Sequence, residues 1–237
     1  MKTILHKSED RGHVDHGWLN TYHSFSFASY YDPSKTHFGA LRVLNDDTVQ
    51  GGKGFGRHFH DNMEIVSIPT SGALQHQDST GHKHVIKQGD IQIMSAGSGI
   101  EHSEKNANDD REVKFFQIWV IPKAHDIAPR YDQKVLSSEN RKNRWQTIVA
   151  PDNKEAVFIN QDAWFSLGNL DKNFSIPYSL HRPENGVYIF VIKGKIEVDG
   201  QSLNSRDALG VWETASIQVQ ANEESEVLLI EVPMKVE

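Results

Sequence analysis

A duplicated pattern of short strands is the feature of this sequence that most limits its possible folds. In the first copy, a β-branched run starts at Glu64 and ends at a glycine turn, Gly72, and Asp90 follows a second turn. In the second copy a similar run ends at Gly194, and Asp207 takes the place of Asp90, at offsets of 117 to 122 residues. Short apolar runs bounded by Gly, Asn, Asp or Pro are typical of strands. The repeat therefore predicts two related all-β units, each a barrel or sandwich.

The division between the units is predicted near residues 122–130, where Ile-Pro-Lys-Ala-His-Asp-Ile-Ala-Pro-Arg interrupts the strand runs. We assign residues 1–125 to the first unit and 126–237 to the second. One short helix is expected at 137–145, beginning at a serine cap. The strands predicted with most support are 40–44, 63–69, 72–79, 90–95, 113–121, 156–161, 163–168, 187–193, 195–198, 208–212, 215–219 and 226–232.

Composition excludes several classes of protein. The net charge of −7 and the absence of a long Lys/Arg cluster argue against nucleic-acid binding through a basic surface. No apolar run approaches the roughly 18 residues that a membrane span needs, and the N-terminus does not resemble a signal peptide. The chain has no cysteine, which excludes a disulfide scaffold and a thiolate-held metal. These observations fit a cytoplasmic protein that makes no membrane contact.

Two dyads of polar residues, 42 positions apart, predict a metal site. They are His58-Phe-His60 and His102-Ser-Glu104. Side chains two residues apart in a strand point to the same face. If the two strands lie side by side, three imidazoles and one carboxylate converge on one point. Such a ligand set suits one divalent transition metal: Fe(II), Mn(II), Ni(II), Cu(II) or Zn(II).

The second unit lacks these dyads. At an offset of 122 residues, Leu180 and Arg182 stand where the first unit has His58 and His60, and His181 falls between them. We therefore expect the second unit to bind no metal by this route and to pack against the first.

The two dyads resemble the two motifs of cupin barrels, with small departures. Ser95 stands where proline is usual, and two extra residues precede His102. Cupins commonly bind the metal through the glutamate of the first motif, here Glu64, whereas Glu104 shares a strand face with His102. If both bound, the divalent centre would be neutral and would attract an anionic substrate less. The spacing alone leaves Glu64 and Glu104 both open.

Beyond these motifs, the chain resembles the pirin family, most closely the bacterial pirin-like quercetin 2,3-dioxygenases. The resemblance rests on residues 11–33, 54–60, 92–104 and 117–119, and it extends across essentially the whole chain. It implies a bicupin, two tandem jelly-roll β-barrels with few short helices. It also implies one metal in the first barrel, most often Fe(II). The family's His-x-His and His-x-Glu ligands correspond to His58, His60, His102 and Glu104, and Glu64 then orients ligands by hydrogen bonds.

The function that the resemblance implies is a metal-dependent dioxygenase. Its substrates would be a flavonol-type aromatic molecule such as quercetin and O2, with carbon monoxide lost and Glu104 as the catalytic proton acceptor. Two alternatives stay open. One is a metal-dependent regulatory protein that binds a protein partner without turnover. The other is a different metal reaction, such as isomerisation or hydrolysis of a small oxyacid.

Two further segments have alternative interpretations. His76 is in phase with Leu74 and Asp78, so it either supports a metal ligand by a hydrogen bond or faces the surface. The aromatic segment 18–31 is interpreted as core packing against the first barrel in preference to a platform for substrate.

Overall fold

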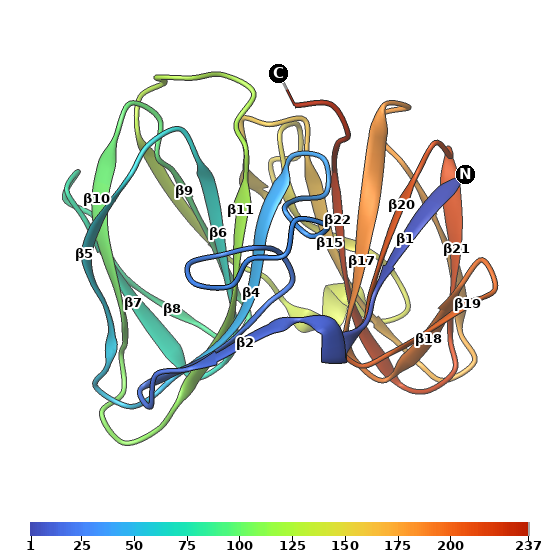
Figure 1. Ribbon diagram of the computed structural model, residues 1–237, viewed down its shortest axis with the longest axis horizontal. Helices are drawn as coiled ribbons and strands as arrows, with labels where there is room; N and C mark the ends of the chain where they lie inside the picture. The colour runs from blue at the N-terminus through green and yellow to red at the C-terminus, as the bar shows by residue number, and fades with distance from the viewer. Residues whose placement is uncertain (237) are drawn as a thin grey trace.

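The computed structural model describes residues 1–236, which form two β-barrels side by side along the long axis of the molecule (Figure 1). Each barrel consists of a seven-stranded sheet and a four-stranded sheet. In the first barrel the strand orders are β12-β9-β6-β11-β4-β3-β2 and β5-β10-β7-β8. In the second they are β1-β20-β17-β22-β15-β13-β14 and β16-β21-β18-β19. The prediction of two all-β units is confirmed.

The strands of the two seven-stranded sheets have the following bounds. In the first barrel they are β2 (Gly12–Asp15), β3 (Leu19–His23), β4 (Leu41–Val49), β6 (Glu64–Ser71), β9 (Asp90–Ser95), β11 (Val113–Val120) and β12 (Arg130–Val135). In the second they are β1 (Lys2–His6), β13 (Gln146–Ala150), β14 (Val157–Phe158), β15 (Trp164–Leu170), β17 (Asn185–Lys193), β20 (Ala208–Trp212) and β22 (Ser225–Pro233).

The four-stranded sheets form the outer walls of the molecule in Figure 1. The first is made of β5 (Gly54–His60), β7 (Ala73–Asp78), β8 (Lys83–Lys87) and β10 (Ile100–Asn106). The second is made of β16 (Ser175–Ser179), β18 (Lys195–Val198), β19 (Gln201–Asn204) and β21 (Ser216–Ala221).

Two strands cross the predicted division between residues 125 and 126. β1, from the start of the chain, pairs with β20 in the second barrel. β12, which follows the division, pairs with β9 in the first barrel. Each barrel thus receives an edge strand from the other part of the chain, which ties the two units together. The exact point of division stays a prediction.

The seven-stranded sheets are buried on both faces, because one face packs against the other seven-stranded sheet and the opposite face lines the interior of its own barrel. One apolar cluster contains Val66, Phe116 and Ile118 of the first barrel together with Phe165 and Phe190 of the second. Strands covered on both sides read as continuous buried runs and lose the alternation of a half-exposed strand. In β6 the first six residues are all buried, whereas the outer strand β10 alternates buried and more exposed positions.

Within residues 1–236, regular helix is confined to two short 3-10 segments, η1 (Ser8–Asp10) and η2 (Ser138–Arg141). The helix predicted at 137–145 is therefore only partly formed. Ser137 does accept a hydrogen bond from the backbone of Glu139, as a cap should, but a single turn follows and the chain enters β13 at Gln146. Neither of these segments has the length and hydropathy that a transmembrane helix requires, and the rest of residues 1–236 contains no such helix either.

Candidate metal centre

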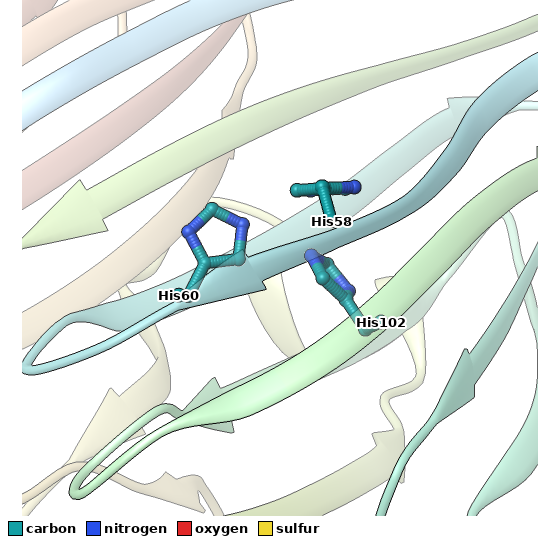
Figure 2. A group of neighbouring side chains, drawn as sticks. All are labelled: His58, His60 and His102. Carbon is teal, nitrogen blue, oxygen red and sulfur yellow. The ribbon is translucent and has the colours of Figure 1, made fainter.

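β5 and β10 are antiparallel neighbours, and their pairing brings the two dyads together. His58 lies opposite His102, and His60 lies opposite Ile100. Figure 2 shows the three imidazole rings on one side of this strand pair. The ring centroids are 4.4 Å apart for His58 and His102, 4.8 Å for His58 and His60, and 4.9 Å for His60 and His102. One ligand nitrogen from each ring lies within 4.8 Å of the others.

Gly54 permits the close approach of these two strands. A Cβ atom at this position would lie 2.4 Å from both the Glu104 carbonyl oxygen and the Lys105 Cα atom of β10. Any side chain here would force β5 away from β10, and glycine is the residue that tolerates such backbone proximity. The register also shifts between His102 and Glu104, as in a β-bulge.

The free nitrogens of the cluster fit a metal ion. His58 Nδ1 lies 2.8 Å from the Gly56 carbonyl oxygen, so Nδ1 donates and Nε2 keeps its lone pair. His102 is 1% exposed, and no hydrogen-bond partner for its Nε2 exists among residues 1–236. A buried polar atom without a partner costs free energy unless a bound ion or other ligand satisfies it.

The electrostatics of the cluster keep two of its imidazoles, those of His60 and His102, neutral. Burial, together with repulsion from the neighbouring rings, lowers the pKa of His60 to about 4. The same causes lower the pKa of His102 to about 3. Neutral imidazole is the form that binds metals, so at neutral pH these two side chains need not lose a proton before binding.

Glu104 follows His102 on β10 and belongs to a second group with His102 and His76, whose ligand atoms also lie within 4.8 Å of one another. Its carboxylate is 1% exposed and is held by three polar side chains. Ser67 Oγ lies 3.0 Å and Gln92 Nε2 3.4 Å from Oε1, and Gln117 Nε2 donates to Oε2. The two groups share His102, so His58 and His60 form one group with this ring, and Glu104 and His76 form the other.

The side chain of Glu64 lies on the face of β6 opposite to that of Ser67. Val66 and Ile68, which are in phase with it on β6, pack between the barrels, whereas Ser67 points toward Glu104. The Glu64 carboxylate accepts hydrogen bonds from Ser95 (2.8 Å) and from Asn160 of the second barrel (2.7 Å). The hydrogen bond to a metal ligand that was expected of Glu64 has no counterpart among residues 1–236. Ser95, which stands where the cupin motif usually has proline, instead donates a hydrogen bond to this buried carboxylate.

His76 faces the interior of the first barrel and contacts a metal-site residue. It is fully buried, and its Nδ1 lies 3.4 Å from His102 Nδ1. Its other nitrogen, Nε2, lies 2.9 Å from Asp78 Oδ2. The Tyr131 ring of β12 packs against His76 with a centroid separation of 4.8 Å. Asp78 and Tyr131 were not among the predicted site residues; the i, i+2 spacing of His76 and Asp78 was the available signal.

A cavity of about 280 Å³ lies between β3 and β5, which are edge or near-edge strands of the two sheets, and none of the four predicted ligands lines it. Trp18, Phe27 and Phe55 supply aromatic walls, and Thr21 and Asp47 are among the polar residues that line it. Burial raises the pKa of Asp47 to about 7, and the Thr21 hydroxyl donates to its carboxyl group.

Aromatic contacts connect this cavity to the histidines. The Phe27 ring lies 5.3 Å from the Trp119 ring, which in turn lies 4.9 Å from the His60 ring. The aromatic segment 18–31 therefore has two roles. Core packing against the first barrel was predicted for the whole segment. Phe25, which is 1% exposed, does pack in an apolar core, the one between the barrels, whereas Trp18 and Phe27 line the cavity.

Comparison with protein-family models identifies both barrels. Residues 5–120 match the model described as Pirin, and residues 147–232 match the model described as Quercetinase C-terminal cupin domain. An Escherichia coli K12 protein named quercetin 2,3-dioxygenase is 40% identical over 232 residues, which cover 97% of this chain and 98% of that protein. A pirin-like protein of Caulobacter vibrioides is 39% identical over 222 residues, covering 93% of this chain and 95% of that protein.

Solved structures show the same architecture. The crystal structure of YhhW from Escherichia coli superposes with a TM-score of 0.94 at 38% identity and covers 100% of this chain and 99% of its own. A second structure, described as bacterial pirin YhhW in complex with nickel(II), gives a TM-score of 0.92 at 38% identity, covering 99% of this chain and 100% of its own. The predicted fold of two cupin barrels is confirmed.

Proposed function

Because this chain belongs to the pirin family, we propose that it is a metal-dependent dioxygenase that cleaves flavonol-type, quercetin-like substrates with O2. The observation that carries the proposal is the convergence of three imidazoles, which Trp119 and Phe27 link to a cavity with aromatic walls. The relative from Escherichia coli K12 that is named quercetin 2,3-dioxygenase supports the reaction class.

The proposed ligands are His58, His60, His102 and Glu104, which would hold one divalent ion in the first barrel. Three neutral imidazoles and one carboxylate leave that ion a net charge of +1. When bound, the ion supplies positive charge that lowers the pKa of a coordinated hydroxyl and holds the resulting anion. We propose Fe(II) as the native metal. Ni(II), Mn(II), Cu(II) and Zn(II) suit the same donors, and a nickel complex is known for the related YhhW.

The residues of the chain would bind and orient the substrate. A flat aromatic ring in this cavity would pack against Trp18, Phe27 and Phe55, since aromatic rings pack against one another in edge-to-face and offset geometries. Asp47 and Thr21 line the same cavity and are suited to hydrogen bonding with phenolic hydroxyl groups.

Glu104 is the proposed proton acceptor for the substrate hydroxyl that approaches the centre. Its hydrogen bonds from Ser67, Gln92 and Gln117 fix the carboxylate in the barrel. A rigidly held base contributes to catalysis by keeping the reacting atoms in position.

The direct test is O2 uptake with quercetin after anaerobic loading of the full-length protein with Fe(II). Quercetin-dependent uptake with release of carbon monoxide is expected from the loaded wild type. The metal-free protein and the variants His58→Ala and His102→Ala should lose it. Equal uptake by those controls would refute catalysis at this site. Bound iron without turnover would favour the regulatory alternative, and turnover of a small oxyacid in its place would favour isomerisation or hydrolysis.

A further inference from the structure

The two ring nitrogens of His102 have different surroundings. Nε2 is buried, faces the cluster with His58 and His60, and has no hydrogen-bond partner within the described part of the chain. Nδ1 lies 3.4 Å from His76 Nδ1, which is a long but recognisable hydrogen-bond distance. A neutral imidazole has one donor nitrogen and one acceptor nitrogen. Because two Nδ1 atoms face each other, the contact is a hydrogen bond only when one ring carries its proton on Nδ1 and the other does not.

Asp78 decides which ring donates. Its Oδ2 lies 2.9 Å from His76 Nε2, and a carboxylate can only accept. His76 therefore carries its proton on Nε2, which leaves its Nδ1 as an acceptor. His102 must then donate from Nδ1, and its Nε2 keeps a lone pair directed at the cluster.

The carboxylate of Asp78 is itself fixed by the turn between β7 and β8. Its Oδ1 accepts from the Thr80 backbone nitrogen (2.9 Å), the Thr80 hydroxyl (2.7 Å) and the His82 backbone nitrogen (3.2 Å). Three donors on Oδ1 orient the group, so Oδ2 is the oxygen presented to His76. β7 also places His76 and Asp78 beside β10, opposite Glu104 and His102 respectively.

We propose that Asp78 and His76 form a relay that fixes the tautomer of His102, so that His102 Nε2 is available to the metal. Both are positioning residues, since they act through His102. The inference rests on the proposed metal site. A carboxylate or other acceptor behind a metal-binding histidine typically contributes a factor of about 10 to 100 in metal affinity. Here a second imidazole stands between the carboxylate and the ligand.

The variant Asp78→Asn tests the relay by reversing it. The oxygen of the introduced amide should occupy the position of Oδ1, where three donors meet, and the amide NH₂ group should face His76 Nε2. His76 would then accept at Nε2 and donate from Nδ1, so His102 would carry its proton on Nε2. The tautomers can be measured in the full-length, metal-free protein by ¹⁵N NMR of the ring nitrogens. Wild-type His102 should be protonated on Nδ1, and in Asp78→Asn it should be protonated on Nε2.

Metal affinity provides a second readout, measured by competition between the protein and a chelator for Ni(II). Asp78→Asn should bind Ni(II) about 10 to 100 times more weakly than wild type. Asp90→Asn is the matched control, because Asp90 is also a buried carboxylate of the first barrel, bonded to the Lys87 backbone and the Gln133 side chain. It should change neither the His102 tautomer nor the affinity.

Two substitutions of His76 keep the proposal testable if Asp78→Asn does not fold. His76→Gln can still accept from His102 and donate to Asp78, so it should retain most of the Ni(II) affinity. His76→Phe can do neither and should lose affinity as Asp78→Asn does. Wild-type His102 protonated on Nε2, or equal Ni(II) affinity in His76→Phe and wild type, would overturn the relay. Failure of quercetin oxygenation with these results intact would count against the proposed reaction and not against the relay.

Discussion

Replacing Asp47 by asparagine should stabilise the protein, and by an amount that grows with pH. Asp47 is 3% exposed, and burial is the main reason that its pKa rises from 3.8 to about 7. Between these two values the folded protein keeps a proton that the unfolded chain has released. The free energy of unfolding contributed by Asp47 therefore falls as the pH rises from about 4 to about 7 and is constant above that range.

The magnitude follows from the two pKa values. Each pKa unit corresponds to about 1.4 kcal/mol, so ionising Asp47 costs the folded state up to about 4 kcal/mol at pH 8. Asparagine has the same shape and no proton to lose, and its oxygen can accept from the Thr21 hydroxyl as Asp47 does. Asp47→Asn should therefore match wild type near pH 4 and exceed its free energy of unfolding by up to about 4 kcal/mol at pH 8.

Urea unfolding of metal-free protein at several pH values between 4 and 8 measures this difference, and the contributions of all other titrating groups cancel between the two proteins. Asp46→Asn is a contrasting control. Asp46 pairs with Arg206 at 2.8 Å and with the largely buried Arg11 at 3.6 Å, so its replacement should destabilise the protein. A pH-independent difference for Asp47→Asn, or a loss of stability at pH 8, would refute the reasoning.

Four further predictions concern the centre and its cavity. Gly54→Val places a Cβ atom 2.4 Å from the β10 backbone, so it should lower both the Tm and the Ni(II) affinity. The control Gly56→Val, whose Cβ atom has nothing within 4 Å, should change the Tm little. A larger loss of Tm in Gly56→Val than in Gly54→Val would contradict the role given to Gly54. Phe27→Ala removes an aromatic wall and should raise the KM for quercetin at unchanged iron content, whereas Phe158→Ala, at an exposed position of the second barrel, should leave the KM unchanged. Nickel at one hundred times its Kd should stabilise wild type by about 2.7 kcal/mol, and His58→Ala should lose most of this gain. Elemental analysis should find one ion per chain, and a value near two would contradict assignment of the metal to the first barrel alone.

The grouping of the predicted metal ligands could be predicted because it depends on a local sequence pattern, the spacing within each dyad. A spacing of two residues fixes the face of a strand, so each dyad was expected to present both of its side chains together. The pairing of β5 with β10 then required only that the two strands be neighbours in one barrel. The location of Glu104 beside His102 follows from the same period. The feature that spacing does not show is the extra residue in β5, where His58 and Phe55 lie opposite His102 and Glu104.

Glu64 shows why the orientation of the other buried polar side chains could not be predicted from the sequence. Its strand, β6, is buried on both faces, so the sequence Glu-Ile-Val-Ser-Ile-Pro has no alternation to show which face lines the barrel. The orientation of the residues that hydrogen-bond to Glu104 was hard to predict for the same reason. Gln92 and Gln117 come from β9 and β11, which are also covered on both sides. The exchange of β1 and β12 between the barrels depends on pairing at sheet edges far apart in the sequence, which leaves no local pattern.

The interior of the first barrel is arranged so that a polar centre can be buried without loss of rigidity. Apolar clusters that include Leu74 and Phe115 at one level and Ile65 and Ile100 at another lie on either side of the polar residues. Between them, Glu104 is hydrogen-bonded by side chains from β6, β9 and β11. Buried polar groups rigidify a core only when their partners are in place, and a partly satisfied network is costly.

The second barrel has a mainly apolar interior, in which one buried carboxylate, Glu231, accepts hydrogen bonds from the Tyr178 hydroxyl, the His181 backbone and the Asn185 side chain. Its interior cluster is apolar, and Leu180, the counterpart of His58, packs against that cluster. The large apolar contact between the seven-stranded sheets then joins this barrel to the first one. Since apolar burial is the main favourable term in folding, the second barrel and the shared core can offset the cost of the polar centre. On this reasoning, substitutions that open the shared core, such as Phe190→Ala, should weaken metal binding only through loss of the fold, whereas substitutions at Asp78 or Gly54 should weaken it in protein that remains folded.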